Sequence, residues 1–312
     1  MSGYPLYPLS KKRRHSMGAL VFSLCLLLAP SVFAGQGAAY LVSPSEPDAI
    51  AYKPLYLSVL TSTELGLSPP LAGSIAQTPA VGRFTIGSDN YLSGKVRIFD
   101  LPVTAAIYPD LYVQLNLPWV SRDVKTASGT SSKSGLGDID LSLKLRMDLG
   151  ESTETYYLLD ARLPTGDKDQ GLGSGSYDIS VAQKLVTWFG AYRSTFMAGV
   201  TAPLSHVTVV DSTVKLSPTV SYMAAAERSL LKPNLWFGIK MAGEHVFNSR
   251  LDGVYQPNGL TTVDVIPETT YYLANGLRLR GALLLPVYTS YVLPGAENSR
   301  GVVVNLGVSK TF

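Results

Sequence analysis

The sequence predicts an all-β protein, a transmembrane antiparallel β-barrel of about 12 strands of the bacterial outer-membrane type. Three observations predict it. Apolar and polar residues alternate in segment after segment between residues 95 and 312, the connections between segments alternate in length, and the chain ends in a strand that closes on Phe312. Successive side chains of a strand point to opposite faces, so each segment has one face suited to lipid and one suited to a polar interior.

Residues 1–34 have the pattern of an export signal. A basic run at 11–14 precedes an apolar stretch at 17–28, and Val32-Phe33-Ala34 offers a small-residue cleavage site before Gly35. An apolar stretch of roughly 12 residues is too short to span a bilayer, which argues against a membrane-anchoring helix. We therefore expect this segment to be removed on export.

Removal of the signal changes the charge balance. It takes away four of the 26 Lys and Arg residues and no Asp or Glu, which leaves 22 basic against 23 acidic residues. Nucleic acid requires a clustered basic face, so no nucleic-acid partner is expected. The sole cysteine, Cys25, lies inside the signal, so we expect neither a disulfide nor a cysteine metal site in the mature chain.

Residues 35–94 form an N-terminal segment rich in Pro, Ser and Ala. About eleven strands are predicted from residue 95 to 312, and single-chain bacterial barrels have even strand numbers, so a first strand is expected upstream. The candidates are residues 53–62 and 81–90. The remainder of the segment is expected to be either a plug inside the barrel or a periplasmic extension.

The predicted barrel strands follow one another from residue 95. Odd residues from Phe99 to Ile107 are apolar, and the turn Tyr108-Pro109-Asp110 leads to a second apolar row at 111–119. The clearest strand spans 138–149, where every odd residue is apolar and every even residue is polar. Eight further apolar rows lie within 157–163, 179–185, 192–204, 214–222, 235–241, 263–273, 277–287 and 302–312.

The connections alternate between long and short. Long polar loops are predicted at 121–136, 165–176, around 206–211, at 248–261 and at 293–300, with shorter turns between them, including a connection at 225–233 and the tight turn Asn275-Gly276. If Phe312 lies at the periplasmic rim, the long loops are external and the short turns are periplasmic. Prolines within strands, such as Pro102, Pro267 and Pro286, remove ladder donors and predict local bulges or openings.

Charges of both signs occupy the rows that are predicted to face inward. Opposite charges on neighbouring strands can pair, and the balance of signs argues against a strongly ion-selective pore. The candidate lumen-lining residues are Asp138, Asp140, Lys144, Arg146, Asp160, Arg162, Lys240, Glu244, Arg278 and Arg280. Both a network of ion pairs that fills the barrel and the lining of a passage agree with this pattern.

Three motifs suggest other chemistry and are better explained by the barrel. The glycine-rich run at 171–176 resembles a phosphate-binding loop, but no helix follows it. The acids at 167–178 do not continue as a calcium loop. His245 is predicted to point outward beside Phe247, at the membrane interface. We therefore expect no catalytic residues, no metal and no cofactor.

Part of the chain resembles a known family. The stretches Ser134-Gly135-Leu136-Gly137-Asp138-Ile139, Leu163-Pro164-Thr165-Gly166-Asp167 and 171–178 are similar to motifs of the outer-membrane transporter family named for the meta-pathway of phenol degradation. The likeness is firmest over residues 93–205. The resemblance implies a barrel that admits hydrophobic or aromatic small molecules, and it supplies no catalytic residues.

These features predict a non-enzymatic outer-membrane channel or transporter for passive passage of small, hydrophobic or aromatic molecules. The expected partners are outer-membrane lipid and lipopolysaccharide, the solute, and the barrel-assembly machinery, which would engage the C-terminal strand ending in Phe312. A barrel with a plugged lumen and a structural or surface-binding role remains an alternative, as does a lipid-directed barrel hydrolase. The competing fold is a soluble secreted β-sandwich, against which the long strands and their wholly apolar rows argue.

Overall fold

A computed structural model describes residues 84–312, apart from 93–95, 127–128, 151, 169, 171, 210–211, 216, 232–233, 252–253, 257–258, 274–276 and 292–301. The predicted signal at 1–34 and the candidate first strand at 53–62 lie outside the described residues.

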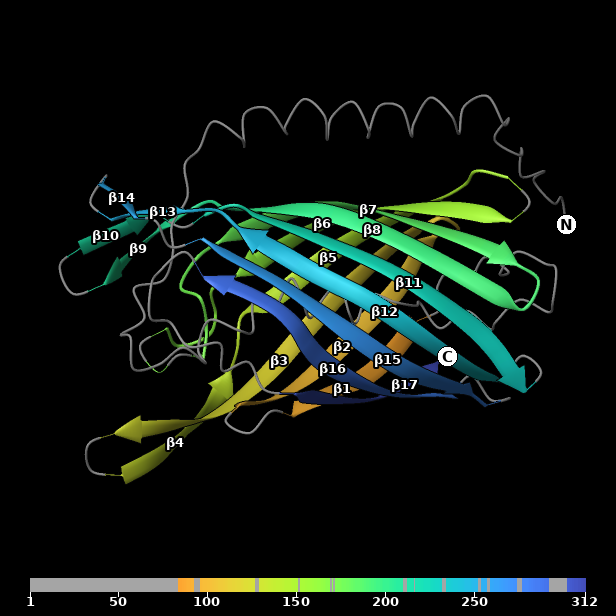
Figure 1. Ribbon diagram of the computed structural model, residues 1–312, viewed down its shortest axis with the longest axis horizontal. Helices are drawn as coiled ribbons and strands as arrows, with labels where there is room; N and C mark the ends of the chain where they lie inside the picture. Colours follow the sequence, from red (N-terminus) through yellow and green to blue (C-terminus); the bar gives the residue numbers. More distant parts are fainter. Residues whose placement is uncertain are drawn as a thin grey trace, which may run out of the picture. The chain divides into compact units, whose positions relative to one another are not determined.

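Twelve antiparallel strands form one closed barrel (Figure 1). Each strand pairs with its neighbours in the chain, β1 pairs with the C-terminal β17, and pairing of β2 with β3 completes the ring. The barrel strands are β1 (Phe84–Leu92), β2 (Val96–Tyr108), β3 (Leu111–Thr126), β5 (Ile139–Asp148), β6 (Thr153–Leu163), β7 (Asp178–Phe189), β8 (Tyr192–Pro203), β11 (Thr219–Leu231), β12 (Leu235–Val246), β15 (Leu260–Tyr272), β16 (Leu277–Tyr291) and β17 (Val303–Thr311). The predicted fold class and strand number are confirmed.

Five short strands lie in the loops. β4 (Gly129–Leu136) pairs with the end of β3 and makes a hairpin within the loop between β3 and β5. β9 (His206–Val209), β10 (Ser212–Lys215), β13 (Ser249–Leu251) and β14 (Val254–Gln256) form a separate sheet of four strands. These four come from the loops that follow β8 and β12, so they extend the same end of the barrel (Figure 1).

The first barrel strand, β1, overlaps the candidate segment at 81–90. Its hydrogen-bonded register runs from the pair Thr85 and Thr311 to the pair Leu92 and Val304, so the two ends of the barrel sequence meet. Phe312 completes the contact, because its ring stacks on Phe84 at 5.0 Å between centroids and its N–H donates to the Phe84 carbonyl at 3.0 Å.

Two expected boundaries around β11 are wrong. The predicted row at 214–222 is divided, since residues 212–215 belong to β10 and the barrel strand begins at Thr219 after Pro218. The predicted connection at 225–233 is largely strand, because β11 continues to Leu231. The alanines at 224–226 present almost no contrast between the two faces, which hid the continuation of the strand from a pattern of hydrophobic alternation.

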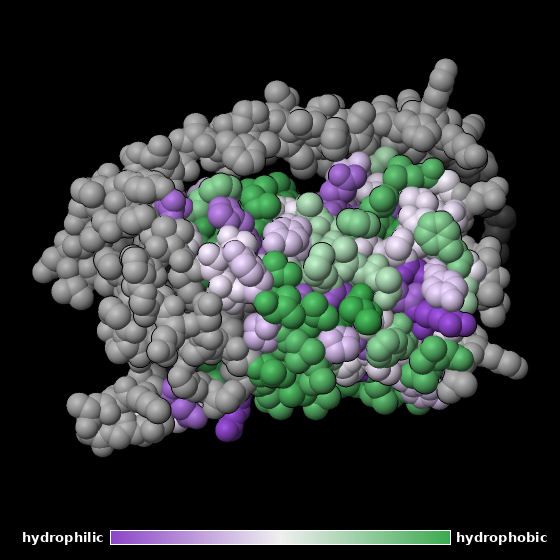
Figure 2. Space-filling view, viewed as in Figure 1, coloured by the Kyte–Doolittle hydropathy of each residue, from purple (hydrophilic) through white to green (hydrophobic). Residues whose placement is uncertain are grey.

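The two faces of the wall differ in burial as the alternation predicts. Along β5, Asp140, Ser142, Lys144 and Arg146 are buried, whereas Leu141 and Leu143 are exposed to the outside. Figure 2 shows apolar side chains gathered over the strands of the visible wall. A row that is polar and buried beside a row that is apolar and exposed is the arrangement of a barrel wall in lipid.

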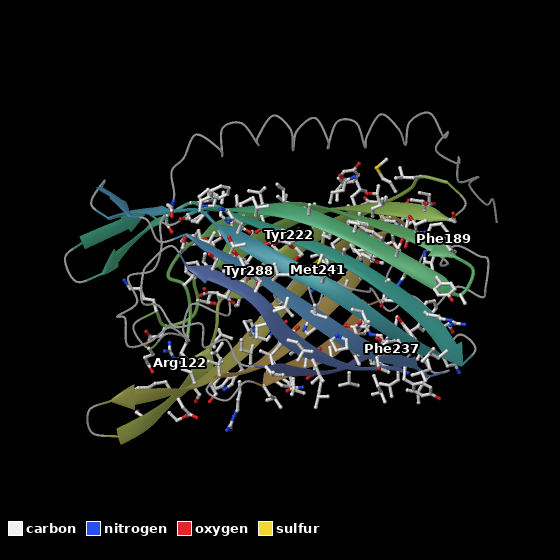
Figure 3. All side chains as sticks on the ribbon, in the orientation of Figure 1. Arg122, Phe189, Tyr222, Phe237, Met241 and Tyr288 are labelled. Atoms are coloured by element: carbon white, nitrogen blue, oxygen red, sulfur yellow. The ribbon has the colours of Figure 1, made fainter. Side chains whose placement is uncertain are left out.

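Large aromatic side chains lie near both ends of the strands. Tyr108, Phe189, Tyr192 and Phe312 are at the short-turn end, with Trp119, Tyr177 and Tyr288 toward the long loops, and all seven are at least 51% exposed. Figure 3 shows Phe189 and Tyr288 toward opposite ends of the barrel. Aromatic girdles of this kind sit at the two membrane interfaces of outer-membrane barrels.

Interruptions of the ladder accompany some of the prolines. Between the described residues of β1 and β2, Gly87 and Ser88 have no paired partner beside Pro102. The β15–β16 ladder omits Ile266 and Pro267, and its register shifts next to Pro286. Pro118 and Pro203, by contrast, sit in continuous pairing with Asp100 and Asp178. Among the described residues, no helix is long and apolar enough to cross a membrane.

Candidate functional site

The barrel interior holds the ten candidate residues that the sequence singled out. Nine are buried, and Arg278 is partly buried. In a closed barrel the buried face of a strand is its interior face, so these side chains lie on the inside of the wall. They come from β5, β6, β12 and β16, with Asp138 just before β5.

Arg162 is the centre of the first ion-pair group. Its Nε lies 2.9 Å from Asp140 Oδ1, and its Nη1 lies 3.1 Å from Asp178 Oδ2. The three residues stand side by side on β5, β6 and β7, because the register pairs Arg162 with Asp140 on one side and with Asp178 on the other. One guanidinium thus compensates two buried carboxylates.

Asp138 holds the loop between β6 and β7. Its Oδ1 accepts the N–H of Gly166 at 3.1 Å and its Oδ2 accepts the N–H of Ser174 at 2.6 Å. Thr165 adds a bond from its hydroxyl to the Gly137 carbonyl at 2.8 Å. The three motifs that carry the family resemblance therefore meet at one place, at the long-loop end.

Glycine is required where these motifs meet. A Cβ on Gly166 would lie 2.7 Å from the Cα of Gly173, closer than real Cβ atoms approach backbone. Gly166 and Gly173 thus let two backbone segments touch, which agrees with the interpretation of the glycine-rich run as a structural loop.

A second polar group lies on β3, β5 and β6. Lys144 Nζ donates to Gln114 Oε1 at 2.5 Å, and Gln114 Nε2 donates to Asn116 Oδ1 at 2.6 Å. Nearer the short turns, Arg146 lies 2.7 Å from Glu154 and 3.0 Å from Asp148.

A third group lies on β12, β15 and β16. Lys240 Nζ is 3.0 Å from Glu268 Oε2, and Arg280 Nη2 is 2.8 Å from the same oxygen. Arg278 donates to Ser309 Oγ at 3.1 Å. Glu244 is buried on β12, toward the long loops. Lys240 and Arg280 therefore share one carboxylate, which leaves this group with a formal excess of positive charge.

One pair was missed by the sequence prediction of the site. Arg193 forms a bidentate ion pair with Glu227, with both N···O distances at 2.7 Å. Its guanidinium also lies 5.2 Å from the Trp188 ring centroid and 5.5 Å from that of Trp236. Glu227 fell in the segment expected to be a connection, whereas β11 carries it into the interior.

The interior also contains an apolar zone that the alternation did not predict. Its buried members contact one another across β1, β2, β8, β11, β12, β15, β16 and β17. They are Tyr91, Ile98, Met197, Met223, Ala242, Ile266, Ala282, Leu284 and Val303. Inward-facing apolar residues cannot be told from lipid-facing ones by type alone, so only the register reveals this zone.

Charges in the interior separate along the barrel axis. The strand positions near the long loops carry mainly acids, and those from mid-height to the short turns carry mainly bases. The first set, among described residues, is Asp100, Asp138, Asp140, Asp160, Asp178, Glu244 and Asp264, with Arg162. The second is Lys144, Arg146, Lys184, Arg193, Lys240, Arg278 and Arg280, with Glu154, Glu227 and Glu268. The overall balance of signs therefore conceals two zones of opposite sign.

His245 lies beside Phe247 as expected, with its ring edge-on at 4.7 Å between centroids. Its Nδ1 is 2.8 Å from Thr261 Oγ1. The side chain of Ser249, the serine considered with it for a hydrolase, lies outside the described part of the chain. The described residues include no cluster of three His, Cys, Asp or Glu side chains arranged for a metal.

The closed ring, the apolar outer wall and the two aromatic girdles define a bacterial outer-membrane β-barrel of the porin-like class. Residues 74–222 match the family described as "Putative MetA-pathway of phenol degradation". The family resemblance predicted from the motifs at 134–178 is therefore confirmed over this part of the chain. A comparison with curated proteins finds no match.

Three solved structures are similar to this chain, and the first of them shares its fold. The crystal structure of the COG4313 outer membrane channel from Pseudomonas putida F1 superposes with a TM-score of 0.61 at 13% identity, over 76% of this chain and 97% of that chain. The KdgM porin gives a TM-score of 0.47 at 6% identity, over 73% of this chain and 99% of that one. The NanC porin gives 0.49 at 7% identity, over 73% and 98%.

Proposed function

We propose that this barrel is a passive channel of the outer membrane for small hydrophobic or aromatic molecules. Such a solute would diffuse down its gradient, without cofactor or energy coupling. The observation that carries the proposal is the apolar zone of the interior, which includes Met197, Met223 and Ile266. A hydrophobic solute gains by contact with this zone, whereas a hydrated ion loses its water there.

The axial charge separation supports the same solute class. A small cation that enters from the long-loop end first meets acids, which attract it, and then bases, which repel it. A small anion that enters from the same end is first repelled by the acids and then attracted by the bases. Each sign is opposed in one half of the barrel, whereas an uncharged solute is opposed in neither. The family description, which refers to phenol degradation, agrees with an aromatic solute.

Four further parts of the proposal concern partners and the N-terminus. The exposed apolar wall would contact outer-membrane lipid and lipopolysaccharide. The C-terminal strand that ends in Phe312 would be the segment engaged by the barrel-assembly machinery. Residues 35–83 would either constrict the lumen or extend into the periplasm, and the cleaved signal would be 1–34.

Liposome swelling with phenol, benzyl alcohol and a sugar of similar size tests the proposal. Met223→Gln makes the apolar zone more polar, and we expect it to slow swelling by the aromatic solutes about tenfold or more. Burial of a Met side chain away from water contributes roughly 1.5–3 kcal/mol, and about 1.4 kcal/mol corresponds to a factor of ten. Met241→Gln is the matched control, because Met241 is 49% exposed on the outer wall (Figure 3). Equal swelling by sugar and aromatic solutes in all three proteins would contradict the proposal.

A plugged barrel with a structural or surface-binding role is the second candidate. The ion pairs around Arg162, Arg193 and Glu268 favour it, because they bridge neighbouring strands and occupy interior space. This candidate predicts no swelling with any solute and no conductance in planar bilayers.

A further inference from the structure

Lys184 is a buried cation surrounded by apolar and aromatic side chains. It lies on the interior face of β7, is 8% exposed, and its ammonium stands 5.5 Å from the Tyr156 ring centroid. The register places Tyr156 beside it on β6 and Met197 beside it on β8. Ala182 and Val186 precede and follow it on the same face of β7. All four nearest positions on the wall are therefore apolar or aromatic.

No carboxylate of the described residues lies within ion-pairing distance of the Lys184 ammonium. The acids whose fields reach it are Glu154 and Glu227. Glu154 forms an ion pair with Arg146 at 2.7 Å, and Glu227 forms a bidentate ion pair with Arg193. Lys184 thus carries a charge that the nearby acids, already engaged with arginines, compensate only weakly.

The apolar zone begins at the residue that pairs with Lys184 on the neighbouring strand β8. Met197, paired with Lys184, is itself paired with Met223, and both belong to the buried apolar cluster. Ala182 packs against this cluster and against the smaller one that contains Tyr156 and Val186. A positive group therefore lies at the junction of two apolar surfaces inside the barrel.

We infer that Lys184 binds the carboxylate of amphipathic solutes, whose aromatic or aliphatic part lies over Met197 and Met223. This inference rests on the proposed function and adds to its neutral solutes one further group, hydrophobic molecules that carry a single anionic group. An inorganic anion would meet the ammonium but not the apolar contacts, so the site distinguishes a carboxylate with a hydrocarbon chain from chloride. The acids near the long loops oppose anion entry, and the combined ammonium and apolar contacts offset that cost.

Binding is measured with the purified full chain in a nonionic detergent, by calorimetry and by tryptophan fluorescence. The probes are phenylbutyrate and phenylbutanol, which differ only in the anionic group. We expect the wild-type protein to bind the carboxylate about tenfold more tightly than the alcohol, as a charge-assisted hydrogen bond does. Lys184→Met should abolish this preference and leave the affinity for the alcohol unchanged, and Lys184→Arg should restore it.

Lys144→Met is the matched control. Lys144 is also a buried interior lysine, but its ammonium already donates to Gln114, so the preference for the carboxylate should persist in this variant. A preference retained in Lys184→Met would overturn the inference. So would a wild-type ratio of carboxylate to alcohol affinity below about twofold, and this comparison needs no variant to fold.

Swelling of liposomes by phenylbutanol separates this inference from the proposed function. If the neutral alcohol crosses but carboxylate binding does not depend on Lys184, the site is refuted and passage stands. If carboxylate binding depends on Lys184 but no solute crosses, passage is refuted and the site stands.

Discussion

Single side chains in this barrel perform different tasks although the sequence pattern treats them alike. Asp138 and Asp140 both belong to the polar row before and within β5. Asp140 pairs with Arg162 on the wall, whereas Asp138 accepts two backbone N–H groups of the loop at 164–177. Alternation predicts which way a residue faces, but the partner depends on how a distant loop folds back.

Loss of the Asp138 carboxylate should release this loop. We expect Asp138→Ala to speed tryptic cleavage after the exposed Lys168 at least about tenfold, because two charge-assisted hydrogen bonds of roughly 1.5–3 kcal/mol each are lost. Cleavage is followed by mass spectrometry on protein in detergent. Asp148→Ala, at the opposite end of β5, should leave the rate unchanged, and equal rates in the two variants would show that Asp138 does not hold the loop.

At the scale of elements, strands with strong contrast between their faces were predictable. β5 alternates without exception between apolar and polar residues, and its position follows from the sequence. β11 was predicted poorly for two reasons. Ala224, Ala225 and Ala226 do not indicate which face of the strand points inward, and Pro218 separates β11 from β10. The Arg193–Glu227 contact could not be predicted from the sequence, because it follows from the register between β8 and β11.

The Arg193–Glu227 contact should stabilise the β8–β11 pair. Glu227→Gln leaves the buried guanidinium without its carboxylate, and we expect the free energy of unfolding to fall by about 3 kcal/mol. Urea unfolding in lipid vesicles, followed by the fluorescence of Trp188 and Trp236 beside the pair, measures the change.

The neighbouring Arg228 offers a control for that measurement. It is exposed and lies 5.1 Å from the Tyr192 ring centroid, so Arg228→Gln should cost about 1 kcal/mol or less. If Glu227→Gln is no more costly than this variant, the buried pair does not stabilise the barrel.

For the whole molecule, the closed ring and the strand number were predictable, because lipid permits strands only in a barrel without free edges. The apolar zone inside and the axial separation of charge were not predictable. Both depend on the strand register, which decides which residues of neighbouring strands lie at the same level along the barrel axis. The proposed passage of hydrophobic solutes depends on these two features.

The central claim is that apolar rows face lipid and the alternate rows face an enclosed interior. The only cysteine of the sequence lies at position 25, so single cysteines can be introduced along β5 of the mature chain and spin-labelled in liposomes. We predict that labels at Leu141 and Leu143 are accessible to oxygen dissolved in lipid, whereas labels at Ser142 and Lys144 are not, in a period of two along the strand. Uniform accessibility to a water-soluble nickel reagent at all four positions would contradict the account.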